Sequence, residues 1–218
     1  MSIPSFLYRF YERLLRRQIF SGRIPHHVGL IVDGNRRYAA AMGLAKRTEG
    51  HKLGSDKLED FLSWCLDLNI KIVTLYGFST ENYNRSEEEV SEVMGIILKK
   101  FQTLQTDPVI KDEGVKIKVI GQRDTLSQEM RQEIDKIERM TANHTEFQLN
   151  IALSYGGRAE IIDAVKEVAS KVKRGELELQ EIDETLFSRH LYTEGLPDPD
   201  LIIRTSGEER LSGFLLWQ

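Results

Sequence analysis

The chain has 218 residues, of which 40% are apolar and 29% are charged. This composition is typical of a globular protein and excludes collagen, coiled coil and long disorder, while the length predicts one large domain or two very small ones. Basic residues number 30 and acidic residues 34, for a net charge of −4. The basic excess of a nucleic-acid-coating protein is therefore absent, and we expect no nucleic-acid partner.

The cysteine content indicates a reducing compartment. Cys65 is the single cysteine, which excludes an internal disulfide and a cysteine-rich zinc site. No apolar run approaches the ~20 residues that span a bilayer. Four arginines interrupt the N-terminal apolar residues, so no signal-peptide pattern is present. We expect a cytoplasmic protein.

The first predicted element is a helix over residues 4–20. Its apolar residues recur at helical spacing, with arginines between them. We favour a helix that packs on the domain with its arginines in water, as many surface helices do. The alternative is a basic amphipathic helix on a membrane surface, which would make the protein peripheral at the membrane.

Five short apolar runs follow, each ended by a turn signal, and they predict strands. They cover residues 28–32, 70–76, 115–120, 147–153 and 201–203. Helical patterns lie between them, one capped by Ser55, one opened by the capping pair Ser86 and Glu89, and one over residues 161–172. This alternation predicts a single α/β domain over 1–218, with a mostly parallel central sheet that is flanked by helices and covered on both faces. The charged segment 174–199 is expected to be peripheral.

Polar and basic residues collect directly behind these strands, where open α/β sheets bind ligands. The first strand is followed by Asp33, Gly34, Asn35, Arg36, Arg37, Arg47 and His51, the second by Ser79, Thr80, Glu81, Asn82, Asn84 and Arg85, and the last by Arg204, Ser206, Gly207, Arg210 and Ser212. Arginines, hydroxyls and glycines suit phosphate groups. Asp33 would repel a phosphate unless Mg²⁺ joined them. Two separate groups of arginines indicate two anionic groups.

Each of these features has a simpler explanation when taken alone. Asp33-Gly34-Asn35 is a good turn, and His51 is an ordinary hydrogen-bonding residue. The chain lacks the common glycine-rich nucleotide-binding motifs, and its histidines have no zinc spacing with Cys65. The functional interpretation therefore rests on co-location after successive strands. Composition alone is also consistent with a different function, that of another Mg²⁺-dependent enzyme acting on phosphate esters.

Four stretches resemble the cis-prenyltransferase family, which contains undecaprenyl and dehydrodolichyl diphosphate synthases. They are residues 27–39 with 47–54, residues 75–85, residues 150–158 and residues 200–218. The match runs in order from about residue 25 onward. The residues around Arg36 and Tyr38, with the N-terminal helix, are more similar to archaeal and eukaryotic members than to bacterial ones.

The resemblance implies repeated condensation of isopentenyl diphosphate onto an allylic diphosphate, farnesyl or geranylgeranyl diphosphate, with cis double bonds. The product would be a polyprenyl diphosphate used as a glycosyl carrier lipid. The resemblance assigns Mg²⁺ binding to Asp33 and either proton removal or substrate positioning to Asn82. We favour positioning for Asn82 because an amide is a poor base. The resemblance assigns substrate binding to Gly34, Asn35, Arg36, Arg37, Tyr38, Arg47, His51, Ser79, Thr80, Glu81, Tyr83, Arg85, Arg204, Arg210, Leu211 and Ser212. The last group from Arg204 onward would hold isopentenyl diphosphate.

A growing apolar product needs storage, so we expect an apolar tunnel between the sheet and the helices. Candidate wall residues are Leu58, Phe61, Leu62, Val93, Met94, Ile97 and Phe101.

A homodimer is expected from the family. The family's metal-site glutamate would fall after Gln218, and the apolar ending indicates that the natural chain continues. The alternative function is a non-catalytic subunit, which would lack Asp33 and much of the first arginine group.

Overall fold

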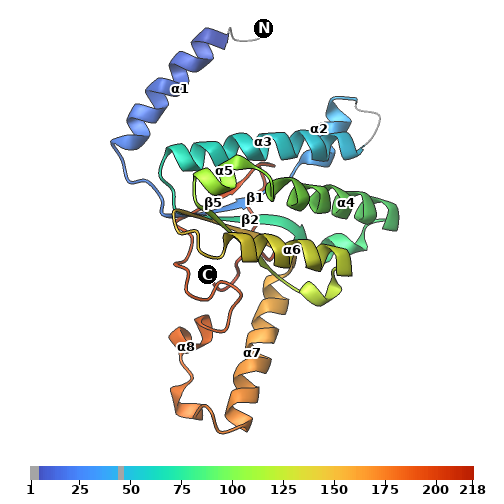
Figure 1. Ribbon diagram of the computed structural model, residues 1–218, viewed down its shortest axis with the longest axis vertical. Helices are drawn as coiled ribbons and strands as arrows, with labels where there is room; N and C mark the ends of the chain where they lie inside the picture. The colour runs from blue at the N-terminus through green and yellow to red at the C-terminus, as the bar shows by residue number, and fades with distance from the viewer. Residues whose placement is uncertain (1–4, 44–46) are drawn as a thin grey trace.

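The computed structural model describes residues 5–43 and 47–218, and for residues 5–9, 12, 47–53, 55 and 56 it describes the backbone alone. Within this part, five parallel strands form one sheet with the order β3-β4-β2-β1-β5 (Figure 1). The strands are β1 (His27–Ile31), β2 (Ile72–Ser79), β3 (Val115–Ile120), β4 (Phe147–Tyr155) and β5 (Leu201–Arg204). All five predicted strands are present, and the predicted α/β fold is confirmed.

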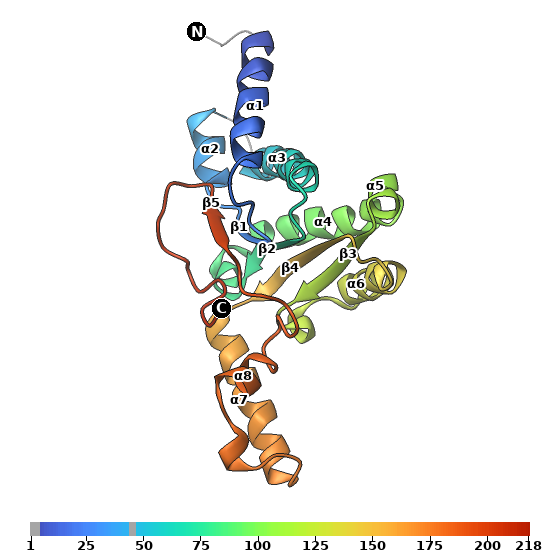
Figure 2. The same cartoon turned by 90° about the vertical axis from the view of Figure 1, so that its left-hand side faces the viewer.

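The helices are distributed unequally over the two faces of the sheet. They are α1 (Ser5–Phe20), α2 (Asn35–Ala41), α3 (Arg47–Asp67), α4 (Glu87–Leu104), α5 (Pro108–Asp112), α6 (Gln128–Thr141), α7 (Gly157–Lys173) and α8 (Glu184–Ser188). Figure 2 shows α3, α4, α5 and α6 on one face, whereas α7 leaves the other face and points away from it. Helices flank the sheet as expected, and the C-terminal segment covers part of the second face.

The main core lies between the sheet and the helix-covered face. Alternate strand residues point into it, such as Val73 and Leu75 of β2, where they meet Phe101 of α4 and Ile134 of α6. These strands are apolar because parallel strands are buried within a domain.

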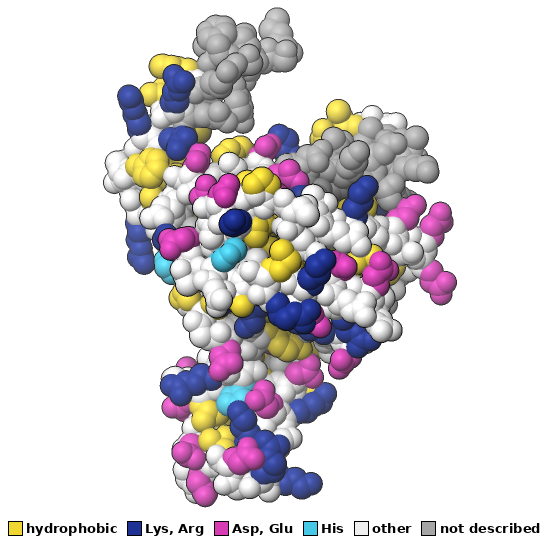
Figure 3. Space-filling view, in the orientation of Figure 1, with side chains coloured by type: hydrophobic (Ala, Val, Ile, Leu, Met, Phe, Trp, Pro, Cys, Tyr) yellow, Lys and Arg dark blue, Asp and Glu magenta, His cyan; other side chains and the backbone are white. Residues whose placement is uncertain are grey.

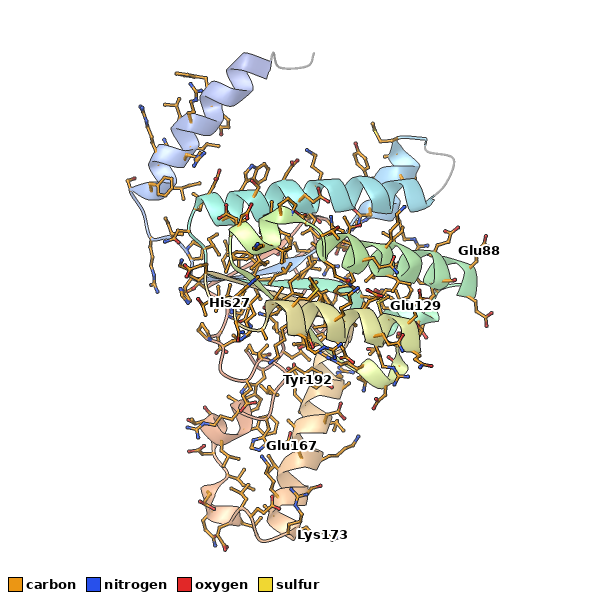
Figure 4. All side chains as sticks on the ribbon, viewed as in Figure 1. His27, Glu88, Glu129, Glu167, Lys173 and Tyr192 are labelled. Carbon is orange, nitrogen blue, oxygen red and sulfur yellow. The ribbon has the colours of Figure 1, made fainter. Side chains whose placement is uncertain are left out.

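The opposite face is packed by the C-terminal segment. Phe214 and Leu215 form a smaller apolar cluster there with strand residues such as Tyr76 and Tyr155. Tyr192 fastens α7 beneath this cluster, where Figure 4 shows it at the start of the helix, because its hydroxyl donates to Asp163 Oδ2 over 2.6 Å.

Of the two helix starts predicted from capping residues, one is confirmed and one is wrong. Ser86 caps α4 as expected, accepting the Glu89 backbone N–H at 3.3 Å. Ser55 does not begin a helix, because α3 begins at Arg47. Gly54 lies inside α3, where a Cβ would come within 2.6 Å of Asn35 side-chain atoms. This glycine allows α2 and α3 to approach closely. Helices α2, α5, α6 and α8 were not predicted.

The N-terminal helix stands apart from the rest of the molecule (Figures 1 and 2). Phe10, Tyr11 and Leu14 are 61%, 57% and 42% exposed, so the favoured expectation that this apolar face packs on the domain is wrong. An ion pair of 3.2 Å between Arg16 and Asp67 joins α1 to the end of α3. In the described ranges, no helix has both the length and the hydropathy to cross a membrane.

Candidate active site

A cavity of about 610 Å³ lies at the carboxyl ends of β1, β2 and β5, at the edge where the sequence predicted a ligand site. Among the predicted site residues, those that line it are Asp33, Gly34, Asn35, Arg36, Arg37, Ser79, Glu81, Asn82, Arg85, Arg204 and Ser212. Residues from three separate parts of the chain therefore share one cavity.

Asp33 is held from several directions at the end of β1. Its Oδ2 accepts hydrogen bonds from Arg204 Nη2 at 2.5 Å and Nε at 3.1 Å, and its Oδ1 accepts the Gly34 N–H at 2.7 Å. Gly34 has a φ of 96°, which suits glycine. Burial raises the pKa of Asp33. Hydrogen bonds, led by those from Arg204, lower the pKa by more than burial raises it, so the pKa of Asp33 lies below its usual value. The carboxylate is therefore ionised at neutral pH.

Thr205 joins the ends of β1 and β5 beside this carboxylate. Its hydroxyl donates to the Asp33 carbonyl at 2.7 Å and accepts the Asp33 N–H at 3.1 Å. Because β1 and β5 are paired as far as Ile31 and Arg204, this clasp fixes Asp33 and Arg204 side by side.

The two arginine groups that are separate in the sequence meet in the structure. Arg204 Nη1 donates to Ser212 Oγ at 3.0 Å and also to the Arg210 carbonyl. Arg37 lies between Asp33 Oδ2 at 3.6 Å and Glu208 Oε1 at 3.4 Å, while Arg210 is 3.4 Å from the other Glu208 oxygen. Internal carboxylates thus neutralise the arginines that would bind substrate anions.

A second charged set lies on the α4 side of the cavity. Glu89 Oε1 is 3.5 Å from Arg36 Nε and 3.1 Å from Arg85 Nη1, and its side chain is only 12% exposed. From the sequence, Glu89 served only the α4 N-terminus. Here it also holds two arginines from different segments at the cavity wall.

Asn82 is oriented by the short 3₁₀ helix that follows β2 (Thr80–Asn84). Its Oδ1 accepts the Ser79 N–H at 3.0 Å, which fixes the plane of the amide. A fixed amide can orient a substrate, whereas its low basicity makes it a poor proton acceptor.

Several predicted substrate-binding residues do not line the cavity. Tyr83 turns away, since its hydroxyl accepts from Ser154 Oγ at 3.1 Å and its ring packs edge-on against Phe78. The others that lie outside the lining are Tyr38, Thr80, Arg210 and Leu211, of which Arg210 contributes its carbonyl to Arg204. Arg47 and His51 belong to α3, and their side chains lie outside the described residues.

Tyr76 is a cavity residue that sequence reasoning missed. It lines the cavity, its hydroxyl donates to the Ser212 carbonyl at 3.2 Å, and its ring stacks on Phe214 with centroids 4.8 Å apart. Its place in an apolar run identified it only as a strand residue. The polar end of a tyrosine near a strand terminus was the available signal.

A second, apolar cavity of about 170 Å³ lies between the sheet and helices α3 and α4. Five of the seven predicted tunnel residues line it, namely Leu58, Leu62, Val93, Ile97 and Phe101, whereas Phe61 and Met94 pack against the core. Val32, Asn35, Gly77 and Val93 line both cavities. The polar cavity therefore adjoins an apolar one.

Comparisons with known proteins agree with this arrangement. A family model described as "Putative undecaprenyl diphosphate synthase" matches residues 31–218. The chain is 49% identical over 211 residues to a protein of Methanopyrus kandleri named tritrans,polycis-undecaprenyl-diphosphate synthase (geranylgeranyl-diphosphate specific), covering 97% of this chain and 78% of that protein. It is 48% identical over 216 residues to an isoprenyl transferase of Thermus thermophilus, covering 97% of this chain and 82% of that protein.

A solved structure supports the same assignment. Lavandulyl diphosphate synthase from Lavandula x intermedia, in complex with dimethylallyl diphosphate, matches with a TM-score of 0.85 and 33% identity over 89% of this chain and 83% of that one. The chain therefore belongs to the undecaprenyl diphosphate synthase family and is a cis-prenyltransferase.

Proposed function

We propose that this protein condenses isopentenyl diphosphate repeatedly onto an allylic diphosphate, farnesyl or geranylgeranyl diphosphate, and forms a cis double bond in each cycle. The observation that carries the proposal is that the charged cavity around Asp33 adjoins an apolar cavity between the sheet and α3 and α4. A substrate with a diphosphate head and a hydrocarbon tail matches this pair of cavities. The relative named as geranylgeranyl-diphosphate specific favours geranylgeranyl diphosphate as the starter.

The donor set fits a Mg²⁺ ion that arrives with the substrate. Among the described residues, no group of three or more His, Cys, Asp or Glu side chains is arranged to hold a metal ion. Asp33 nevertheless provides an ionised, partly exposed carboxylate, and Mg²⁺ is commonly held by one or two carboxylates together with substrate phosphates. When bound, the ion would stabilise the negative charge of the departing diphosphate.

The protein's own residues bind and orient the two substrates. Arg37 and Arg204 exchange their internal carboxylate partners for diphosphate oxygens, and the Ser212 hydroxyl assists Arg204. The allylic carbon–oxygen bond breaks, a carbon–carbon bond forms, and isopentenyl diphosphate loses one proton. Asn82 orients the substrate for this loss, and an oxygen of the substrate's own phosphate takes the proton.

The apolar cavity serves as the start of a tunnel for the growing chain. Each CH₂ transferred from water is favourable by about 0.8 kcal/mol, so the product is stabilised along α3 and α4. The released long-chain polyprenyl diphosphate would act as a glycosyl carrier lipid.

We also propose that the protein is a homodimer in the cytoplasm. Ile162 and Val165 on α7 are 53% and 48% exposed, which supports burial of this helix face against a second copy. The buried thiol of Cys65 suits a reducing compartment. Sedimentation velocity tests the dimer, and a monomer at all concentrations would contradict it.

The decisive experiment is product analysis with radiolabelled isopentenyl diphosphate and starters of several lengths. We expect Mg²⁺-dependent incorporation into long products, most efficiently from the longer starters. A folded protein that incorporates no label from any starter would fit a non-catalytic subunit. Release of phosphate without chain growth would indicate a different phosphate-ester enzyme.

A further inference from the structure

We propose that α1 is a membrane-binding helix that lies flat on an anionic lipid surface. Its apolar side would enter the boundary between headgroups and acyl chains, and its arginines would pair with lipid phosphates. The proposal concerns a part of the chain far from the cavity, and its test requires no turnover, so it stands independently of the proposed function.

The apolar side of α1 is without cover in the described chain. Phe10, Tyr11 and Leu14 fall on one side of the helix by their spacing, and all three are more than two-fifths exposed. Ile19 and Phe20, at the end of the helix, are 41% and 51% exposed. Large apolar side chains gathered in this way mark an interaction surface.

The charge of α1 selects an anionic lipid surface as the occupant. The helix contains four arginines and a single glutamate, although the whole chain has a net charge of −4. Arg13 and Arg17 are one turn apart and border Phe10, so basic and apolar side chains lie next to one another. Figure 3 shows this mixture on the part of α1 that is not grey. A strongly amphipathic helix with basic residues is the pattern of interfacial binding.

The placement of α1 allows it to reach a membrane. Figures 1 and 2 show it projecting from the side of the molecule where α2 and α3 lie. Tyr38 and Met42, in and directly after α2, are 51% and 60% exposed on this side, and Trp64 of α3 is 49% exposed. A flat membrane could therefore contact α1 without obstruction from α7 and α8, which lie at the opposite end.

The test is co-sedimentation of the full chain with vesicles. One set contains phosphatidylcholine alone, and the other contains equimolar phosphatidylcholine and phosphatidylglycerol. We expect binding to the anionic vesicles and its loss at high salt. Because each basic residue near an anionic surface contributes roughly a fivefold gain in partitioning, Arg13→Gln with Arg17→Gln should weaken binding about 25-fold. Phe10→Gln with Leu14→Gln should also weaken it.

Matched controls separate the helix from the rest of the surface. Lys136→Gln with Arg139→Gln removes two charges from exposed positions on α6, and Met140→Gln changes an exposed apolar residue there. These variants should bind like the parent. Circular dichroism checks that every variant retains its helix content, and a chain lacking residues 1–20 provides a second route to the same answer.

The proposal is overturned if the parent ignores anionic vesicles, or if the α1 and α6 variants lose binding equally. It is also overturned if the α1 variants bind vesicles normally but dissociate a dimer in sedimentation velocity. In that case a second copy of this chain covers the helix.

Discussion

Enlarging the α4 side chains that line the apolar cavity should shorten the product, by an amount that depends on the position changed. Val93 lines both cavities, and Ile97 lies four residues further along the helix, a rise of about 6 Å. Val93→Phe should block the passage between the cavities, while Ile97→Trp should block it deeper. We expect both variants to make shorter products than the parent, and the Ile97→Trp product to be about one five-carbon unit longer than the Val93→Phe product.

The size of the effect follows from the volume of the cavity. About 170 Å³ holds five or six groups of water size at roughly 30 Å³ each, which is close to one five-carbon unit. Excluding such a unit removes about 4 kcal/mol of favourable burial free energy. This free energy corresponds to a nearly thousandfold bias toward release of the shorter product. Chromatography of labelled products measures the lengths, and Lys99→Trp, at an exposed position of the same helix, is the control. Products of parental length from folded, active Val93→Phe and Ile97→Trp proteins would refute the reasoning.

Three further predictions concern the arginines, the buried thiol and Tyr83. Arg204→Ala should raise KM for isopentenyl diphosphate more than for the allylic substrate, and Arg37→Ala should do the opposite or lower kcat. Each change removes a charge-assisted contact worth about 1.5–3 kcal/mol, and equal effects on both substrates in steady-state assays would argue against two anion sites. Burial raises the pKa of Cys65 to about 12, so a thiol reagent at pH 8 should label it only after denaturation, and rapid labelling of the native protein would contradict its burial. Tyr83→Phe should cost about 1 kcal/mol in urea unfolding and leave kcat unchanged, whereas a large loss of kcat would place its hydroxyl in the reaction.

The strands and the place of the site could be predicted because local pattern determines them. Apolar runs such as residues 115–120 are short, rich in β-branched residues and ended by glycine, and parallel topology then brings their carboxyl ends together. The capping pair at Ser86 was equally local. Asp33, Arg37 and Arg204 could therefore be assigned to one edge of the sheet before any side-chain position was known.

Side-chain partners could not be predicted, because they depend on packing between distant segments. Asp33 and Arg204 are 171 residues apart, and only the register of β1 against β5 brings them together. The same holds for Arg37 and Glu208, which are also 171 residues apart. The direction of Tyr83 depends likewise on the distant Ser154, in addition to the nearby ring of Phe78. The start of α3 was missed because Ser55 is a typical capping residue, although the helix begins at Arg47 and Gly54 inside it contacts Asn35.

The most direct test of the account is the turnover of Asp33→Ala. Asp33 contacts Arg37 and Arg204, one from each arginine group, and is the carboxylate that we propose binds Mg²⁺. Its loss should lower kcat by roughly 10²–10³ or more at any Mg²⁺ concentration. Circular dichroism and thermal unfolding would confirm that the variant is folded, and labelled isopentenyl diphosphate would measure its rate. We predict a folded protein with almost no incorporation. Near-parental kcat from folded Asp33→Ala would contradict the assignment of this cavity as the active site.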